Sequence, residues 1–442
     1  GIPRIDKVRG MRKWMLVNGY DRVFLSSLDE IAWMLNVRGS DIDYNPLVIS
    51  YLLVSYDAVK WFVRKSPVIN DPETPDSFNE LKLDGVEIMY YDDLFVGLSD
   101  FGEDASGGRI FADPSTLNHN VYKDICEIYG EQNVVFGTSP VILEKAVKTP
   151  SEIENLRQTF VDDGVAMECF LHWLDEEVAT GREVTEWEAS EKLTEFRSQV
   201  PGYRGNSFEN ISAYGPAAAL PHYSTPREGS SVIRPCGLYL VDSGGQYKGG
   251  TTDITRTIAV GPLTQEMIDG YTTVLKSHLI MSMFRLEPDM CSLDLDIAAR
   301  APMRAIGHDF NHGLSHGVGH VLGVHEGPNT VRNSNRVKEH KPDPDTEIKA
   351  GMIMSNEPGL YLEGKFGVRI ENLVVFKEDG EGNIVNEPLT CVPYERKAIN
   401  KALLTDEEIS YVDDYHKWVR DTLTPLLDEE TAAWLADETA PL

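Results

Sequence analysis

The sequence predicts an α+β protein of two domains, a smaller α/β domain followed by a larger domain with mostly antiparallel strands. Three observations support this prediction. Residues 1–147 alternate helix-like and strand-like segments, a helix-start signal follows directly, and the remaining chain contains two strand pairs rich in glycine and acidic residues. Alternating helices and strands are typical of a partly parallel sheet, whereas strand pairs around glycine-rich turns are typical of antiparallel sheets.

The composition argues against several kinds of partner. The 442 residues include 71 acidic and 41 basic ones, and the net charge of -30 disfavours nucleic acid and anionic membranes. No apolar run approaches the length of a membrane span, and the N-terminal segment has no secretory hydrophobic region. Five scattered cysteines without a CxxC pattern favour reduced thiols, so we expect a cytoplasmic location.

The first domain, expected over residues 1–147, shows no pattern that demands chemistry. Helical spacing covers residues 5–17, and Ser27 with Glu30 forms a capping-box motif before a second helix. Short apolar strands are expected at residues 21–25, 47–54, 86–91 and 133–136. The domain is expected to wall off the active site, to form a dimer contact, or to be purely structural.

The second domain, expected over residues 148–442, begins with a long helix. Thr149 and Glu152 form a capping box, and apolar residues at helical spacing continue to about Glu177. A second capping box, Thr185 with Glu188, predicts the next helix. Further expected elements are a strand near 208–213, helices near 265–285 and 293–307, and a helical tail from 405 onward.

Residues 238–258 predict a β-hairpin that carries one acidic residue on each strand. Asp242 and Asp253 lie among β-branched and aromatic residues, and the glycines between them allow the chain to turn back. Burial of a carboxylate is unfavourable unless it is paired or binds a metal, and folding the hairpin brings two like charges together. A single Asp beside a glycine-rich turn is more often a turn residue. The evidence for a metal site is therefore the combination of several acidic residues and histidines, not Asp242 alone.

Residues 352–375 repeat this arrangement, with Glu357 and Glu371 as the acidic pair. Between the two strand pairs lie five of the chain's eleven histidines, namely His308, His312, His316, His320 and His325. Two Asp, two Glu and at least one His form a ligand set that suits two divalent metal ions. Glycines between His316 and His320 argue against a metal-binding helix there, and the HExxH pattern is absent.

These motifs resemble those of the pita-bread metallopeptidases, and within them the Xaa-Pro aminopeptidases. The matching segments are SFENISAYGPAAALPHYS, DSGGQYKGGTTDITRT, HGLSHGVGHVLGVHEGP and SNEPGLYLEGKFGVRIEN. The resemblance implies a pita-bread catalytic domain preceded by a creatinase-like N-terminal domain. It places the five metal ligands of the family at Asp242, Asp253, His316, Glu357 and Glu371.

The resemblance also implies the reaction and the other site residues. The reaction is release of the N-terminal residue from peptides with proline in second position, by attack of a metal-bridging hydroxide. Glu357 is expected to carry the proton, and His222 and His325 to stabilise the oxyanion and contact the substrate. His312 and Arg369 are further substrate-binding candidates. Manganese is the expected metal, with zinc or cobalt as alternatives, and a homodimer is expected.

Three other interpretations stay open. A proline dipeptidase on the same fold would share all five ligands and differ in the length of its substrate. A methionine aminopeptidase needs no N-terminal domain of this size. A non-catalytic binding protein on this fold would typically have lost ligands. Two departures from the family pattern are the charged, proline-rich stretch 331–347 and the absence of a recognisable further N-terminal domain, which the three-domain members carry.

Overall fold

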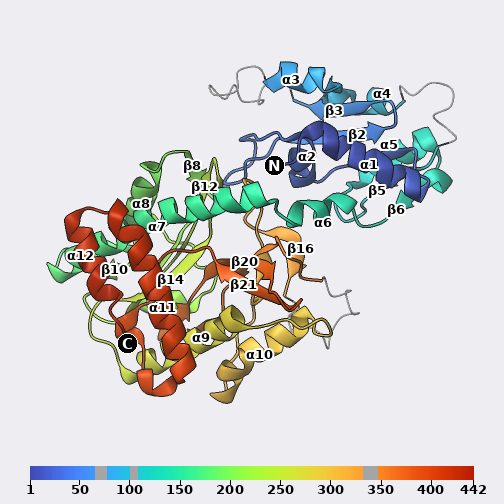
Figure 1. Cartoon of the computed structure of the whole chain (residues 1–442). Coiled ribbons are helices and arrows are strands. Elements are labelled where there is room, and N and C mark those ends of the chain that lie inside the picture. Colours follow the sequence, from blue (N-terminus) through green and yellow to red (C-terminus); the bar gives the residue numbers. More distant parts are fainter. Residues whose placement is uncertain (65–76, 100–107, 332–346) are drawn as a thin grey trace. The chain divides into compact units, whose positions relative to one another are not determined.

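The computed structural model describes residues 1–64, 77–99, 108–331 and 347–442. They form two compact units, Gly1–Lys145 and Ala146–Leu442, and each unit has its own core (Figure 1). Most of the charged, proline-rich stretch, residues 332–346, lies outside the described residues.

The first unit is built on a six-stranded sheet with the order β4-β3-β2-β1-β5-β6. Its strands are β1 (Arg22–Leu25), β2 (Ser50–Ser55), β3 (Val59–Val63), β4 (Val86–Tyr90), β5 (Ile110–Ala112) and β6 (Val134–Phe136). Its helices are α1 (Arg4–Asn18), α2 (Leu28–Leu35), α3 (Ser77–Leu83), α4 (Leu94–Ser99), α5 (His119–Tyr129) and α6 (Pro140–Ala146). β1 pairs with β5, β5 with β6 and β3 with β4 in parallel, whereas both pairings of β2 are antiparallel. The predicted partly parallel sheet is therefore confirmed.

One local prediction in this unit is wrong. Helix α2 begins at Leu28, but Ser27 makes no capping hydrogen bond and instead donates to Asp29. The Glu30 carboxylate accepts a hydrogen bond from the Ser139 hydroxyl, far along the chain. Burial, despite this hydrogen bond, raises the pKa of Glu30 to about 7. A tertiary partner has thus replaced the local one that the capping-box motif implies.

The second unit begins with the long helix α7 (Pro150–Ala179), and here the capping box is confirmed. The Thr149 hydroxyl accepts from the Glu152 N–H, and the Glu152 carboxylate accepts from the Thr149 N–H at 2.8 Å. At α8 (Glu186–Ser198) only half of the predicted box forms. Thr185 accepts from the Glu188 N–H, but the Glu188 carboxylate pairs with Arg182.

The strands of the second unit form small sheets in which every pairing is antiparallel. A three-stranded sheet, in the order β14-β11-β9, contains β9 (Ile211–Tyr214), β11 (Leu238–Ser243) and β14 (Ile254–Ala259). A five-stranded sheet, in the order β16-β15-β17-β20-β21, contains β15 (His316–Gly317), β16 (Glu326–Thr330), β17 (Ile353–Asn356), β20 (Asn372–Glu378) and β21 (Ile384–Pro388).

Both predicted strand pairs form, as β11 with β14 and as β17 with β20, but each contains an additional small hairpin. Between β11 and β14 lie β12 (Gly245–Tyr247) and β13 (Gly250–Thr251), which form a separate sheet with β8 (Tyr203–Asn206) in the order β13-β12-β8. Between β17 and β20 lie β18 (Gly359–Leu362) and β19 (Phe366–Arg369). Gly244 permits the first departure, since a Cβ there would lie 2.0 Å from the Thr252 carbonyl oxygen.

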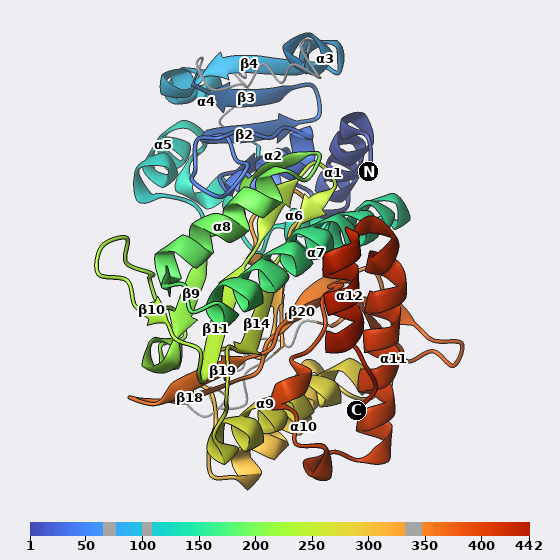
Figure 2. The ribbon, with the colours of Figure 1, turned by 90° about the vertical axis from the view of Figure 1, so that its left-hand side faces the viewer.

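Helices cover these sheets. α9 (Gln265–Met283) and α10 (Ser292–Ala305) contribute to the largest apolar core, and α11 (Asp406–Leu423) and α12 (Glu429–Glu438) form the tail. Figure 2 shows α11 and α12 beside α7, and both pack against it. Trp434, in α12, packs against α7, where its indole N–H donates to Asp175 at 3.2 Å. Trp418, in α11, is 37% exposed.

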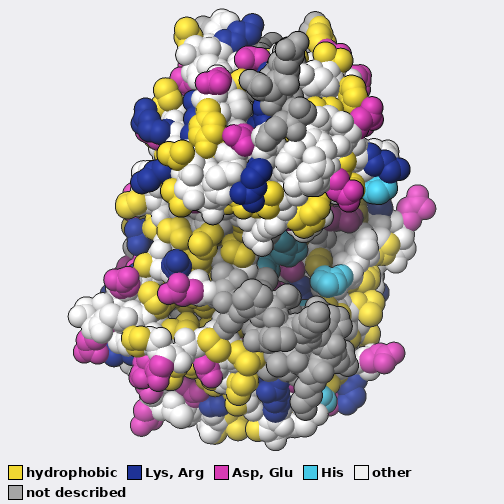
Figure 3. All heavy atoms as spheres, turned by 90° about the vertical axis from the view of Figure 1, so that its right-hand side faces the viewer, with side chains coloured by type: hydrophobic (Ala, Val, Ile, Leu, Met, Phe, Trp, Pro, Cys, Tyr) yellow, Lys and Arg dark blue, Asp and Glu magenta, His cyan; other side chains and the backbone are white. Residues whose placement is uncertain are grey.

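Charged side chains on the described surface are scattered and do not gather in one patch on the face that Figure 3 draws. Figure 3 shows acidic, basic and hydrophobic side chains interspersed over one face of the molecule. Among the described residues, no helix is both long enough and apolar enough to cross a membrane.

Candidate metal centre

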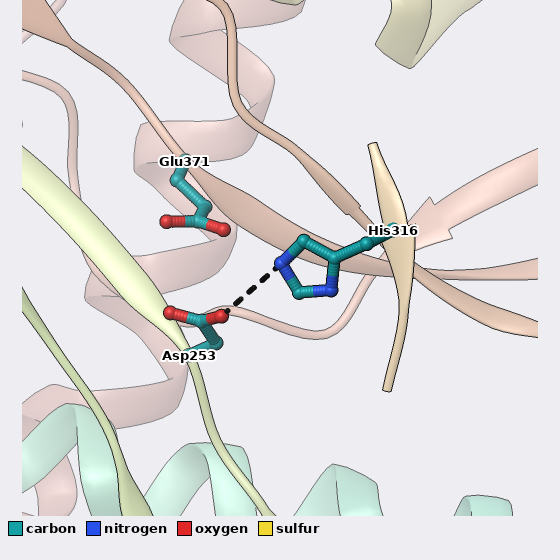
Figure 4. Close-up of side chains that lie close together, drawn as sticks. All are labelled: Asp253, His316 and Glu371. Atoms are coloured by element: carbon teal, nitrogen blue, oxygen red, sulfur yellow. Dashed lines mark ion pairs between the residues drawn. The ribbon is translucent and has the colours of Figure 1, made fainter. Parts of the chain in front are cut away.

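Three side chains from distant parts of the second unit converge in its interior. The ligand atoms of Asp253, His316 and Glu371 all lie within 4.8 Å of one another (Figure 4). His316 Nε2 is 3.5 Å from Asp253 Oδ2. An isolated bridge between Thr255 and Glu371 joins the two strand pairs at this point, with the Glu371 N–H donating to the Thr255 carbonyl. The strand pairs therefore meet where their acidic residues lie.

The remaining two predicted ligands complete the cluster. Glu357 Oε1 lies 3.4 Å from His316 Nε2. Asp242 Oδ2 accepts from Arg369, which also donates to the Thr255 hydroxyl that binds Glu371, so Asp242 lies beside the same group of side chains. The structure thus brings together all five residues that the resemblance selects as ligands.

The predicted position of one carboxylate on each strand is wrong in detail. Only Asp242 lies within a strand, β11. Asp253 immediately precedes β14, Glu357 immediately follows β17, and Glu371 lies between β19 and β20. Strand ends suit converging ligands because the backbone leaves the sheet there, and side chains need not alternate between its faces.

The electrostatics of the cluster are those of a site that requires positive charge. Burial, assisted by the neighbouring carboxylates, raises the pKa of Glu371 well above its usual range. The same causes raise the pKa of Asp253, and that of Glu357 to about 7. Burial opposes protonation of His316, but Asp253 and Glu357 outweigh it and raise its pKa to about 9. Four carboxylates at such close range favour a bound cation.

The donor atoms fit divalent metal ions. Asp242 Oδ1 and Glu371 Oε1 are buried, and the described residues offer them no hydrogen-bond partner. A buried carboxylate oxygen in that position is costly unless it binds a cation. His316 Nδ1 lies 2.9 Å from the Gly317 carbonyl oxygen, which holds a proton on Nδ1. Nε2 faces the carboxylates, and a metal ion would bind there by displacing the second proton.

Other polar groups orient the ligands. Arg369 is 3% exposed, and its guanidinium donates to Asp242 Oδ2 at 2.6 Å, to Thr255 Oγ1 at 3.1 Å and to the Tyr361 hydroxyl at 2.9 Å. The Thr255 hydroxyl in turn donates to Glu371 Oε2 at 2.8 Å. Arg369 therefore joins the predicted ligand Asp242 to Thr255 and Tyr361.

The sequence interpretation missed three of these supporting residues, namely Tyr361, Thr255 and Ser355. Ser355 donates to Glu357 Oε1 at 3.1 Å and accepts from the His316 N–H at 2.9 Å. A signal was available, since Thr255 and Ser355 each lie two residues from a ligand carboxylate in an extended segment. Tyr361 gave no comparable signal, because its role depends on how β18 folds over the site.

Two of the other predicted histidines lie close to the cluster. The His325 ring is 4.4 Å from the His316 ring, edge to face, and burial lowers the pKa of His325 to about 4. His312 Nε2 lies 2.8 Å from the Tyr361 hydroxyl, and burial, with Arg369, lowers the pKa of His312 to about 3. Both imidazoles are therefore neutral near pH 7.

The remaining histidines differ in their surroundings. His222 is exposed, and its charge acts on the pKa of both His312 and His325, so it lies near them. His308 is exposed. The charge of His320 contributes instead to the lowered pKa of Glu152, at the start of α7. Of the histidine-rich segment, His316 is in the cluster and His312 and His325 lie close to it, whereas the described contacts of His308 and His320 do not link them to it.

Family models match nearly the whole chain. A model of metallopeptidase family M24 matches residues 154–378, and a model of the creatinase/prolidase N-terminal domain matches residues 1–152. A third model, of the C-terminal region of peptidase M24, matches residues 386–442.

Curated proteins and solved structures agree with these matches. The chain is 35% identical to Xaa-Pro aminopeptidase 1 of Dictyostelium discoideum, covering 99% of this chain and 68% of that protein. It is 33% identical to aminopeptidase P2 of Arabidopsis thaliana, covering 100% and 65%. The chain thus spans roughly two thirds of the length of these relatives.

Among solved structures, the chain resembles an X-prolyl aminopeptidase from Caenorhabditis elegans, described as a cytosolic enzyme with a di-nuclear active site. The TM-score is 0.91 at 32% identity, covering 100% of this chain and 71% of that one. A Xaa-Pro dipeptidase from Bacillus anthracis gives a TM-score of 0.66 at 25% identity, covering 89% and 99%. The likeness to the aminopeptidase is therefore the stronger of the two.

Proposed function

We propose, because the chain belongs to metallopeptidase family M24, that it is a metal-dependent aminopeptidase which releases the N-terminal residue from peptides with proline in second position. The observation that carries this proposal is the convergence of Asp242, Asp253, His316, Glu357 and Glu371 from two strand pairs and the segment between them. Four carboxylates and one imidazole are the donor set of a di-metal hydrolase.

Two divalent ions would be held by these five residues. When bound, such a pair supplies Lewis acidity and lowers the pKa of a water molecule to about 7. Manganese is the proposed ion because four of the five ligands are carboxylates, and zinc and cobalt are alternatives.

Glu357 is the residue proposed to carry the proton. Its side chain is 18% exposed, compared with 13% for Asp242 and 6% for Asp253, and Glu371 as a whole residue is 2% exposed. Among the four carboxylates, Glu357 thus has the best access to water and peptide. It would take the proton from the attacking water and return it to the leaving nitrogen.

His325 and His222 are proposed to act on the substrate. A neutral imidazole donates one N–H, which suits the oxyanion that forms at the scissile carbonyl. His325 lies against the ligand His316, and His222 is exposed nearby. His312 has both ring nitrogens engaged, with the Gly313 carbonyl and the Tyr361 hydroxyl, which supports a channel-lining role instead.

Arg369 is proposed to act through Asp242 rather than on the peptide directly. A planar guanidinium fixes two or more acceptors at defined angles, which an ammonium group cannot do. Its guanidinium donates to Asp242, Thr255 and the Tyr361 hydroxyl, so it ties a proposed ligand to two supporting side chains. A substrate-binding role for Arg369, which the resemblance implies, is therefore less well supported than a positioning role.

We further propose that the protein acts in the cytoplasm as a homodimer, without nucleic acid or membrane partners. The relative from Caenorhabditis elegans is described as cytosolic, and the net charge of -30 supports repulsion from polyanions. The first unit, expected as a domain over residues 1–147, is proposed to serve the dimer or the substrate channel.

A matched pair of peptides tests the activity. The protein is stripped of metal, reconstituted with manganese, and given an Xaa-Pro dipeptide and a longer Xaa-Pro-Xaa peptide. Metal-dependent release of the first residue from the longer peptide is expected. Cleavage of the dipeptide alone would establish a proline dipeptidase, and no cleavage with two ions bound would establish a binding protein.

A further inference from the structure

We infer that Gln246 and Thr251 are positioning residues for the proposed reaction, because they clamp the loop that carries His325 to its place beside His316. This loop, residues 318–325, connects β15 to β16, and we term it the histidine loop. Neither clamp residue belongs to the predicted ligand or substrate set. The inference rests on the proposed function, since it assigns these residues a part in that reaction.

The clamp binds both backbone polar groups of one residue in the loop. Gln246 Nε2 donates to the Leu322 carbonyl oxygen at 2.8 Å. The Thr251 hydroxyl accepts from the Leu322 N–H at 3.3 Å and donates to Gln246 Oε1 at 2.8 Å. Gln246 is 3% exposed and Thr251 is fully buried. Water therefore cannot replace these hydrogen bonds without a rearrangement.

The backbone beside the clamp is strained. Val321, directly before Leu322, has a φ of +54°, a conformation that β-branched residues rarely adopt. Such strain persists only where surrounding contacts enforce it, and it is frequent at functional sites. A hydrogen bond from the Gly319 N–H to the Gly323 carbonyl, at 3.0 Å, closes the loop around this position. The loop therefore has a fixed shape that the clamp can maintain.

The histidine loop has a direct geometric consequence for the site. β15 and β16 pair with a register shift, so that His316 faces Thr330 while Gly317 faces Glu326. The loop leaves the sheet at this irregularity and returns at His325, whose ring is 4.4 Å from that of His316. Irregular pairing of this kind re-aims side chains near active sites. Movement of Leu322 would therefore move His325.

The clamp also explains the small hairpin inside the first strand pair. β12 and β13 carry Gln246 and Thr251, and they leave the sheet of β11 and β14 to reach the loop. Gly250 lets the same hairpin pack closely on α7, since a Cβ there would lie 2.3 Å from Leu156 Cδ2. The segment between Asp242 and Asp253 thus positions a histidine that lies about seventy residues later in the chain.

Thr251→Val tests the clamp, because it removes the hydroxyl and keeps the branched shape, and Thr251→Ser restores the hydroxyl. Thr272→Val is the matched control. Thr272 is also fully buried, donates to the Ile268 carbonyl at 2.8 Å and accepts from the Asn400 N–H at 2.8 Å, away from the site. Each change is made in the full chain, with and without His325→Ala, and kcat, KM, bound metal and amide exchange at Leu322 are measured.

Thr251→Val is expected to lower kcat by roughly 10-fold to 100-fold, with two metal ions still bound and faster exchange of the Leu322 amide. Thr251→Ser should restore most of kcat. In the His325→Ala background, Thr251→Val should lower kcat little further, because both changes disable the same group, the His325 imidazole. Thr272→Val should change neither kcat nor Leu322 exchange.

An equal loss of kcat from Thr251→Val in both backgrounds would overturn this inference and leave the proposed function intact. A kcat of Thr251→Val equal to that of Thr272→Val would have the same meaning. Unchanged exchange at Leu322 would do the same. Absence of any cleavage by the wild-type enzyme would overturn the proposed function, and the amide exchange would still report whether the clamp holds the loop.

Discussion

The second unit buries carboxylates in two different ways, at the metal centre and on the core-facing side of helix α7. At the centre, Asp242, Asp253, Glu357 and Glu371 face one another and are oriented by Arg369 and His316. In the core, Glu168 is fully buried, and neither of its oxygen atoms has a hydrogen-bond partner among the described residues. The centre requires a cation, whereas the isolated acid can remain neutral by keeping its proton.

The two regions differ in the cause of their raised pKa values. Burial is the main cause that raises the pKa of Glu168 to about 8, against the attraction of Arg256 and with a smaller contribution from Glu438. At the centre, mutual repulsion adds to burial. A buried acid is therefore evidence for a metal site only where several acids share one position and orienting groups hold them there.

The largest effect is expected for Glu357→Ala. The change removes both a ligand and the proposed proton carrier, so turnover should fall by about 10³-fold or more and metal affinity should weaken. Peptide hydrolysis and bound metal would be measured together. Glu363→Ala, at an exposed position between β18 and β19, is the control. Near-normal activity of Glu357→Ala would refute the role of Glu357.

The next effect is expected for His325→Ala, which separates substrate groups from ligands. Loss of an oxyanion donor should lower kcat by about 10²-fold to 10³-fold, while two metal ions remain bound. Metal analysis of the purified variant decides the outcome. If metal is lost, His325 is itself a ligand and the set of five ligands is wrong. His308→Ala, at an exposed position in the same segment, should leave activity unchanged.

A smaller effect is expected for Arg369→Lys. Lysine keeps the charge but cannot contact Asp242, Thr255 and Tyr361 together, so Asp242 should lose its fixed orientation. Metal affinity or turnover should fall by roughly 10-fold to 100-fold. Lys365→Arg, at an exposed pair with Glu266, is the control. A variant with lower apparent peptide affinity but unchanged metal binding and kcat would favour direct contact with substrate.

The smallest effect, on stability only, is expected for Glu168→Gln. Because the folded-state pKa is raised from 4.5 to about 8, the folded protein holds this proton more tightly than the unfolded one. The wild-type free energy of unfolding should therefore fall as pH rises from about 4.5 to about 8. Glu168→Gln should remove this part of the pH dependence and stabilise the protein near pH 8 by on the order of 1–3 kcal/mol.

Urea unfolding at pH 5.5 and pH 8, with saturating metal, would measure the effect, and hydrolysis should remain at the wild-type level. Glu363→Gln is the control for an exposed acid. An unchanged pH dependence would show that Glu168 is ionised or paired in the folded protein.

The sequence predicted helix starts and strand pairs correctly where the interacting residues lie close together in the chain. The Thr149 capping box and the pairing of β11 with β14 follow from residues close in the chain. The Ser27 capping box failed because Ser139, a residue distant in sequence, is the partner of Glu30. Tyr361 escaped notice for the same reason, since its partners His312 and Arg369 lie on other segments. Glu168 likewise lies in a helix whose apolar spacing does not reveal how deeply it is buried.

By itself, the sequence determined which residue types would gather, because acidic residues in apolar strand segments need a cation and the motifs around them select five ligands. Only the tertiary structure decided how these groups are held. It placed three carboxylates at strand ends and brought Arg369 into hydrogen-bonding distance of Asp242. It also turned the glycine-rich segment after β11 toward the histidine loop. The physical reason is that hydrogen bonds between distant segments depend on chain packing, which local spacing does not encode.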